Sequence, residues 1–264
     1  DHFGLPGYRL AEIILLRKRD IMKKNVVIVL ALAALALVSC GFPVRYTTVR
    51  GTGDVITETR RVAGFDRVEL SGIGTLIIEQ GDTESLEINA EKNLMPYLVS
   101  RVSGSTLDLG VEQLVSLQPT EEIVYRLTVI DLNAVETSGL GNVQIAALET
   151  SQFRIEISGS STFTIGDLQA EKLNVDVSGM GDITVAGRAA EQRVELSGAG
   201  TYLAGELQTN STRISISGSG NATVWAEEDL NVEISGVGAV EYFGSPVIDS
   251  EISGAGKLVS AGEK

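Results

Sequence analysis

Apolar and polar residues alternate in short runs along most of this chain, and one such run recurs eight times. Each copy has an apolar–x–apolar stretch, a Ser-Gly corner with a second small residue two positions later, and another apolar–x–apolar stretch. Alternation with a period of two predicts half-buried β-strands. The copies are marked by Ser71, Ser138, Ser158, Ser178, Ser197, Ser217, Ser235 and Ser253.

From Ser138 onward, successive copies are 18 to 20 residues apart. A fixed period near 20 is typical of a solenoid, and it is too short to include a crossover helix. The residue before each serine and the residue five after it are mostly apolar, so stacked coils would form one continuous core. We therefore predict an all-β fold: a right-handed parallel β-helix with about 18–20 residues per coil, in two or three short strands.

The Ser-Gly-x-Gly segments predict tight corners, where glycine would supply a positive φ at little cost. Gly-x-Gly also occurs in phosphate-binding loops, but those loops open a helix. A strand pattern follows every copy here, so we interpret the glycines as corner residues. Ser161 replaces the second glycine of one copy, and we expect little effect because turns often accept serine.

The start of the chain has the features of an export signal. Residues 1–21 are interpreted as a non-native or upstream extension before Met22, with a long native leader as the alternative. Residues 22–39 predict a signal peptide, because two lysines precede an apolar run. That run ends in Ser-Cys-Gly, which resembles a bacterial lipobox and predicts a lipid attachment site, with palmitate or a similar acyl chain, at Cys40. Cys40 is the only cysteine, and residues 40–53 would form a lipid-anchored tether; signal cleavage elsewhere is the alternative.

The rest of the chain divides into two parts. Residues 54–135 contain one copy of the motif and are expected to form irregular, wider coils that also cap the N-terminal end of the solenoid. A helical turn is expected near residues 93–98. Residues 136–264 form the regular repeats, and no obvious cap follows the last copy, so its strand edge is a candidate surface for homo-oligomer formation.

The charge of the chain narrows its partners. The formal net charge is −14, and residues 1–39 carry six basic and three acidic side chains, so the chain from Cys40 onward carries −17. Such a surface repels nucleic acid and anionic lipid. We therefore expect no nucleic-acid partner, and membrane attachment through a lipid at Cys40 rather than through a basic patch.

An acidic residue stands two positions before seven of the eight serines. In stacked coils these residues would form an outward column, partly offset by arginines two positions earlier. The column is interpreted as a solvated face that keeps strands in register, or as a weak divalent-cation ladder or docking face for a cationic partner. The column comprises Glu69, Glu136, Glu156, Asp176, Glu195, Ser215, Glu233 and Glu251, and the arginines are Arg67, Arg154, Arg193 and Arg213.

Catalysis is not indicated by the pattern, and we expect no enzyme, cofactor or metal site. A β-helix hydrolase or lyase needs unlike groups that interrupt the repeat, and the only histidine is His2. Residues 79–134 could hide such a site. The available side chains there are Asp82, Glu84, Glu87, Glu91, Lys92 and Arg101. Trp225 and Tyr242 are candidates for sugar stacking, but their positions favour core or corner packing.

The repeated Ser-Gly-x-Gly corners, the opening Val62-Ala63-Gly64-Phe65-Asp66-Arg67 and the later Gln80-Gly81-Asp82 and Asn93-Leu94 resemble the bacterial putative auto-transporter adhesin head GIN domain family. The resemblance covers roughly residues 54–260. It implies a right-handed β-helix on a secreted or lipid-anchored envelope protein and carries no catalytic residues.

Together these features predict a non-catalytic, lipid-anchored cell-envelope protein, periplasmic or surface-exposed, and at the outer membrane if the cell is Gram-negative. Its expected role is adhesion, or binding of a surface polysaccharide or protein. The alternatives are a self-assembling envelope scaffold and a carbohydrate-active β-helix enzyme.

Overall fold

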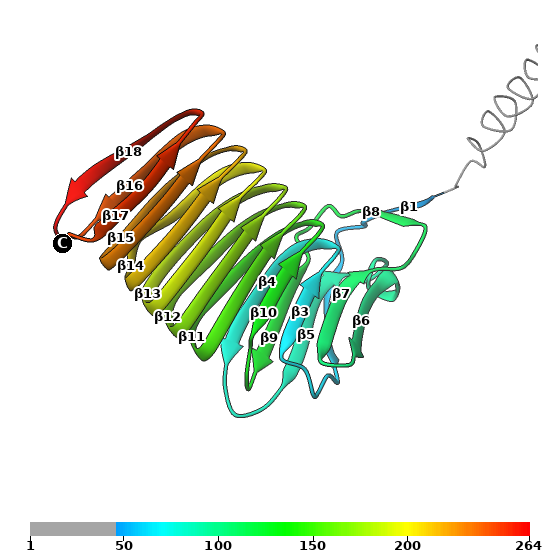
Figure 1. Ribbon diagram of the computed structural model, residues 1–264. Helices are drawn as coiled ribbons and strands as arrows, with labels where there is room; N and C mark the ends of the chain where they lie inside the picture. Colours follow the sequence, from blue (N-terminus) through cyan, green and yellow to red (C-terminus); the bar gives the residue numbers. More distant parts are fainter. Residues whose placement is uncertain (1–45) are drawn as a thin grey trace, which may run out of the picture. The chain divides into compact units, whose positions relative to one another are not determined.

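The computed structural model describes residues 46–264 (Figure 1). Cys40 and the expected signal peptide, residues 22–39, lie outside this range. The described residues form a parallel β-solenoid of about six turns, and their single helical element is the 3-10 turn Met95–Tyr97, within the segment where a turn was expected.

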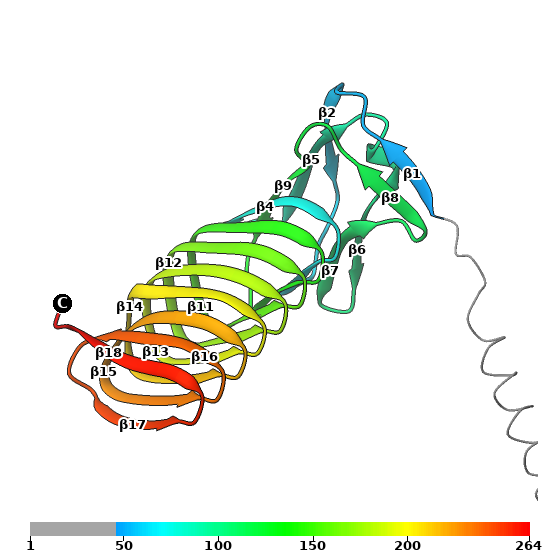
Figure 2. The ribbon, with the colours of Figure 1, turned by 90° about the horizontal axis from the view of Figure 1, so that it is seen from above.

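The regular coils each consist of one long strand that bends around the solenoid (Figure 2). These strands have 16 to 18 residues, not the two or three short strands expected, because backbone pairing with the next coil continues around most of each bend. Neighbouring strands pair in parallel, in chain order. The strands are β11 (Leu140–Ile157), β12 (Ser160–Val177), β13 (Met180–Leu196), β14 (Ala199–Ile216) and β15 (Ser219–Ile234). Three shorter strands follow, β16 (Val237–Phe243), β17 (Val247–Ile252) and β18 (Ala255–Gly262).

The first part of the fold mixes parallel and antiparallel pairing. Strands β3, β4 and β10 join the parallel stack, whereas β5 is antiparallel to β2 and β9, and β6 is antiparallel to β7. Strand β1 pairs with β8, although the sequence placed it in the tether. The strands are β1 (Thr47–Arg50), β2 (Val55–Arg60), β3 (Arg67–Leu70), β4 (Ile73–Gln80), β5 (Ser85–Glu91), β6 (Leu98–Ser103), β7 (Thr106–Val111), β8 (Val115–Gln118), β9 (Val124–Val129) and β10 (Ala134–Thr137).

The two expected columns of the core are confirmed over most of their length. The side chains before the serines are buried from Leu70 to Ile234, and those five residues after the serines are buried from Leu76 to Val240. Register pairs such as Phe163 with Ile183 place them directly above one another. Only at the last copy does the column open, where Ile252 is 40% exposed.

The first glycine of each corner has a different purpose from the one expected. Its φ is not positive in any copy. At Gly198 an added Cβ would lie 1.9 Å from the carbonyl oxygen of Gly179, one coil earlier, and the corners from Gly139 to Gly254 show the same overlap. Glycine is required there because successive corners stack backbone against backbone, with no room for a side chain.

Candidate binding groove

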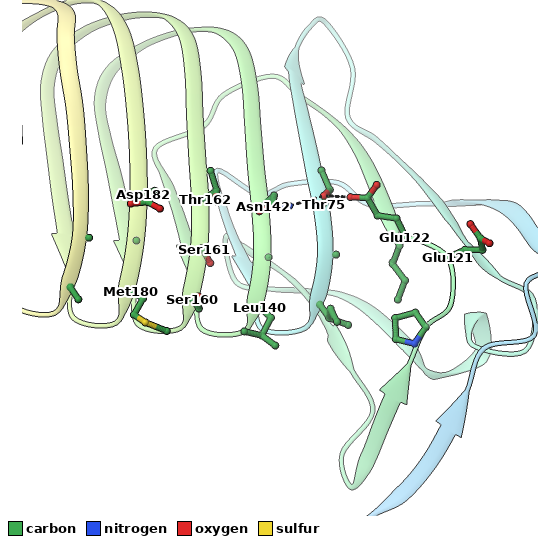
Figure 3. Close-up of a pocket in the computed structure, with 18 of the residues that line it drawn as sticks. Thr75, Glu121, Glu122, Leu140, Asn142, Ser160, Ser161, Thr162, Met180 and Asp182 are labelled. Atoms are coloured by element: carbon green, nitrogen blue, oxygen red, sulfur yellow. Dashed lines mark hydrogen bonds between the residues drawn. The ribbon is translucent and has the colours of Figure 1, made fainter. Parts of the chain in front are cut away.

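A groove of about 770 Å³ runs across the corners of five successive coils (Figure 3). Its floor includes the backbone at the second small residue of each corner, for example Gly141, Ser161 and Gly181. Since the floor is nearly free of side chains, a ligand in the groove would approach the backbone closely. The groove therefore follows directly from the glycine-rich repeat.

Two rows of side chains border this floor. Register pairing aligns Thr75, Asn142, Thr162 and Asp182 in a polar row. The other row comes from the residues between the two small corner positions and includes Leu140 and Met180, which are 62% and 60% exposed. Along the solenoid axis a ligand meets one polar and one small or apolar side chain at each of the first four coils.

The segment between β8 and β9 closes one end of the groove. Pro119, Glu121 and Glu122 line it there. Thr75 Oγ1 donates a hydrogen bond to Glu122, and Asn142 Nδ2 lies 3.4 Å from Thr75 Oγ1. These contacts link the segment between β8 and β9 to the first two residues of the polar row, Thr75 and Asn142.

The buried carboxylate of Glu91 also holds the segment between β8 and β9 in place. It accepts hydrogen bonds from the amide nitrogens of Gly53, Thr120 and Glu121 and from the Thr120 hydroxyl. Burial alone would raise the pKa of Glu91, but these hydrogen bonds outweigh it and lower the pKa to about 2. Two loops distant in sequence are thereby held by one ionised side chain.

The acidic column forms as expected on the other side of the corners. Glu136 pairs with Glu69, Glu156 with Asp176, and Glu233 with Glu251. The expected offset by arginine is confirmed at two of the four positions. Arg154 Nη1 lies 3.1 Å from Glu156 Oε1 and 2.8 Å from Asp176 Oδ2, whereas Arg67 and Arg213 form no ion pair within residues 46–264. Arg193 pairs with Glu195.

Burial and neighbouring charges also shift the pKa values of two carboxyl groups in the column. Burial raises the pKa of Asp176, and the carboxylates of Glu195 and Glu156 raise it further, against the lowering effect of Arg154 and Arg193. Burial, together with Glu136 and Asp108, raises the pKa of Glu69. Within residues 46–264, no group of three or more His, Cys, Asp or Glu side chains is arranged to hold a metal ion.

The six candidate catalytic side chains of residues 79–134 are used separately. Glu84 accepts hydrogen bonds from the backbone of Gly64 and Phe65, and Glu91 holds the loops described above. Asp82 lines a hollow near Gln80, whereas Lys92 and Arg101 line another near Arg60. Glu87 lies on β5, where it is paired with Arg126 of β9 and Thr59 of β2.

Sequence reasoning missed three features of these surfaces. The groove itself was missed, because its rows come from coils that only the register brings together. Asp108 extends the acidic column next to Glu69, but no serine motif marks it. The pairing of Trp225, which is partly buried, with Phe243 on the next coil was not expected.

A family comparison decides the identity of this architecture. The model of the family described as putative auto-transporter adhesin, head GIN domain, matches residues 64–246. The chain belongs to this family. A comparison with curated proteins finds no match.

Solved structures of similar proteins share the GIN-domain fold. A putative adhesin from Bacteroides fragilis is 27% identical, with a TM-score of 0.78 over 80% of this chain and 99% of that one. A protein described as a putative lipid binding protein from Parabacteroides distasonis is 23% identical, with a TM-score of 0.69 over 81% of this chain and all of its own. A putative adhesin from Parabacteroides merdae is 20% identical, with a TM-score of 0.65 over 81% and 99% of the two chains.

Adhesin-like family membership indicates a cell-envelope or surface protein. Among residues 46–264, no helix has the length and apolar character needed to cross a bilayer.

Proposed function

We propose that this GIN-domain protein is a non-catalytic, lipid-anchored envelope adhesin that binds a linear surface polysaccharide along the groove. The observation that carries the proposal is the repetition of the two groove rows at each of the first four coils. A polymer lying along the axis meets equivalent contacts at each rung, and many weak contacts then add to a useful affinity.

The spacing of the rungs favours a polysaccharide over a peptide. Parallel coils are spaced at roughly 4.8 Å, whereas an extended peptide advances by about 3.3 Å per residue. Peptide side chains would therefore drift out of step with the rows. A glycosyl unit of an extended polysaccharide is closer in length to one rung, and its hydroxyls suit the side chains of Asn142 and Thr162.

Two of the three carboxylates that line the groove, Glu122 and Asp182, are placed unlike the catalytic pair of a glycoside hydrolase. Glu122 lies at the rung of Thr75, and Asp182 lies three rungs further, at roughly 14 Å along the axis. The two carboxyl groups of glycoside hydrolases are about 5–9.5 Å apart. This arrangement supports binding without cleavage.

The groove is tested by paired variants on one strand. Thr162 and Thr164 are both exposed on β12, but only Thr162 lines the groove. The wild type is expected to bind at least one member of a panel of purified capsular and envelope polysaccharides. Thr162→Arg should weaken that binding by about tenfold or more, and Thr164→Arg should leave it unchanged. Absence of binding across the panel, or equal loss in both variants, contradicts the proposal.

The lipid anchor is tested separately. Metabolic labelling with a clickable fatty acid is expected to label the wild type and not Cys40→Ala, and protease treatment of intact cells should cleave the domain if it faces outward. Absence of labelling would leave a freely secreted binding protein. Labelling without protease access would place it in the periplasm.

Self-association through the last coils is a second candidate. Strand β17 pairs with β15, and no other strand of residues 46–264 pairs with its second edge. Ile248 and Ile252 on this strand are each 40% exposed, whereas their register partners on the previous coil, Leu230 and Ile234, are buried. A second copy stacked on this edge would cover them. Sedimentation that shows a monomer at every concentration would exclude it.

A further inference from the structure

Two aromatic rings stand together on the last coils of the solenoid. Trp225 on β15 and Phe243 on β16 are register partners on neighbouring strands. At the matching position the earlier coils carry the polar residues Gln169, Arg188 and Gln208. Since those coils close without a ring there, the aromatic pair is not required by the fold.

A carboxylate lies next to the rings because the neighbouring strand bulges. The pairing of β14 with β15 shifts between Ala204 and Gln208, which leaves Gly205, Glu206 and Leu207 unpaired with β15. Gly205 packs against Phe243, since an added Cβ would lie 3.1 Å from the ring carbon Cε2. The bulge thus brings Glu206 to the edge of the aromatic pair.

An ammonium group already occupies this arrangement. Lys264 Nζ lies 5.4 Å from the centroid of the Trp225 ring and 5.1 Å from that of Phe243, and it forms an ion pair with Glu206. The Lys264 side chain is 22% exposed. Two ring faces and a carboxylate are the groups that recognise an alkylammonium ion.

The negative charge around this site favours binding of a cationic ligand. Residues 205–264 carry nine acidic and three basic side chains, one of which is Lys264 itself. A negative surface raises the local concentration of cations. None of Glu206, Trp225 and Phe243 lines the groove, so this surface is separate from the one assigned to the polysaccharide.

We propose that Trp225, Phe243 and Glu206 form a binding site for a lysine side chain of a partner protein, and that Lys264 occupies it in this structure. The ammonium group already bound is that of a lysine, so the two rings and the carboxylate accept the group that a partner lysine would present. A partner lysine must displace Lys264, which makes the site weaker while Lys264 is present.

Trp225 is the only tryptophan of the chain, so its fluorescence reports on this site alone. The full chain and its Lys264→Gln variant are titrated with Nα-acetyl-lysine methylamide. We expect a saturable change in Trp225 emission, with half-saturation at a concentration about 3- to 10-fold lower in Lys264→Gln. The Nε-acetylated analogue, which lacks the charge, should produce no such change.

Matched variants in the Lys264→Gln background separate a site from a general charge effect. Glu206→Gln and Phe243→Leu should weaken binding several-fold, whereas Glu241→Gln, an exposed carboxylate of β16, should not. Thermal melts followed by circular dichroism confirm that each variant folds, and Lys264→Arg provides a second variant in which a cation is retained.

Three results would overturn the proposal. One is an absence of an ammonium-dependent change in Trp225 emission in Lys264→Gln, which would make Lys264 a clamp only. Another is an equal response to the acetylated analogue. The third is a dimer of the wild type that Lys264→Gln dissociates, which would make a second copy the source of the lysine. Loss of groove binding in Thr162→Arg leaves this site unaffected, so the two proposals fail separately.

Discussion

The two parts of the solenoid are stabilised in different ways. From β11 onward each coil repeats the same backbone pairing, the same core columns and the same stacked corner. Before β11 the chain uses single contacts that occur once, such as the hydrogen bonds of Glu91 to two loops and those of Arg60 to Leu98 O and Ser100 Oγ. Regularity distributes stability over many positions, whereas the irregular part concentrates it in a few. The groove lies where the two parts meet.

The largest difference between the parts is expected at the corner glycines. Gly198→Ala places a Cβ 1.9 Å from the Gly179 carbonyl oxygen, so the coils must separate, and we expect a loss of about 3 kcal/mol or more in the free energy of unfolding. Gly72→Ala, in the first copy, would meet Gly110 Cα at 3.4 Å and should be tolerated. Urea denaturation of both variants measures the contrast. Equal losses would show that stacking is no tighter in the regular coils.

The next effect concerns Glu91, the carboxylate that holds two loops of the irregular part. Glu91→Gln should lower the thermal midpoint at pH 7, and Glu79→Gln, at an exposed site on β4, should not. The pKa of Glu91 is lowered from 4.5 to about 2, so its stabilisation is complete above pH 4.5 and is lost as pH falls toward 2. The gap between wild type and variant should therefore narrow over that range.

The acidic column has the opposite pH dependence. The pKa of Asp176 and that of Glu69 are raised in the folded state, so their protonation as pH falls favours the fold. For this reason the comparison of Glu91→Gln with wild type at each pH is more informative than the pH profile of either protein. A gap that stays constant down to pH 2.5 would contradict the assignment to Glu91.

A matched pair of tyrosines gives a smaller contrast. Tyr202 OH donates a 2.9 Å hydrogen bond to Gln192 Oε1 inside the regular coils, and Gln192 Nε2 in turn donates to Thr212. Tyr125 OH, in the irregular part, is buried and has no hydrogen-bond partner among residues 46–264. Tyr202→Phe should cost about 1–2 kcal/mol, and Tyr125→Phe should be neutral or slightly stabilising. Chemical denaturation checks both, and a larger loss at Tyr125 would contradict this interpretation.

The smallest effect is expected at the one corner that departs from the repeat. Ser161 is 7% exposed, and no group in the described part of the chain forms a hydrogen bond with its hydroxyl. The sequence suggested that serine would be accepted there at little cost, but burial of the hydroxyl makes Ser161→Ala stabilising by up to about 1 kcal/mol. The adjacent Ser160→Ala should change nothing. Differential scanning calorimetry compares the two variants. A Ser161→Ala protein that is less stable than the wild type would contradict the interpretation that the buried hydroxyl is unfavourable.

Most of the regular part could be predicted from the sequence, because a fixed period determines which residues of neighbouring coils lie above one another. Once the coils are aligned on their serines, the core columns and the acidic column follow, and both are found in register. Of the expected arginine partners, Arg154 and Arg193 pair with the column. The reason for the first glycine could not be deduced in this way, because backbone contact between coils is invisible in one copy of the motif. The overlap at Gly198 shows it only after stacking.

The irregular part was less predictable, for a physical reason. Its antiparallel pairs join residues whose spacing carries no period, and Glu91 resembles its neighbours Glu84 and Glu87 in sequence. Only the loops that fold onto Glu91 distinguish it. The groove depends on one of these loops, so its closed end at Glu122 could not be foreseen from the repeat.

The assignment of the groove as the binding surface is tested most directly by mapping where the ligand contacts the protein on living cells. A photo-cross-linking amino acid is placed at Leu140, which lines the groove, or at Leu203, an exposed position on the same face outside it. After irradiation of the producing cells, we predict a carbohydrate-positive cross-linked product from position 140 and none from position 203. Equal products from both positions, or a product from position 203 alone, would contradict the assignment of the groove as the binding surface.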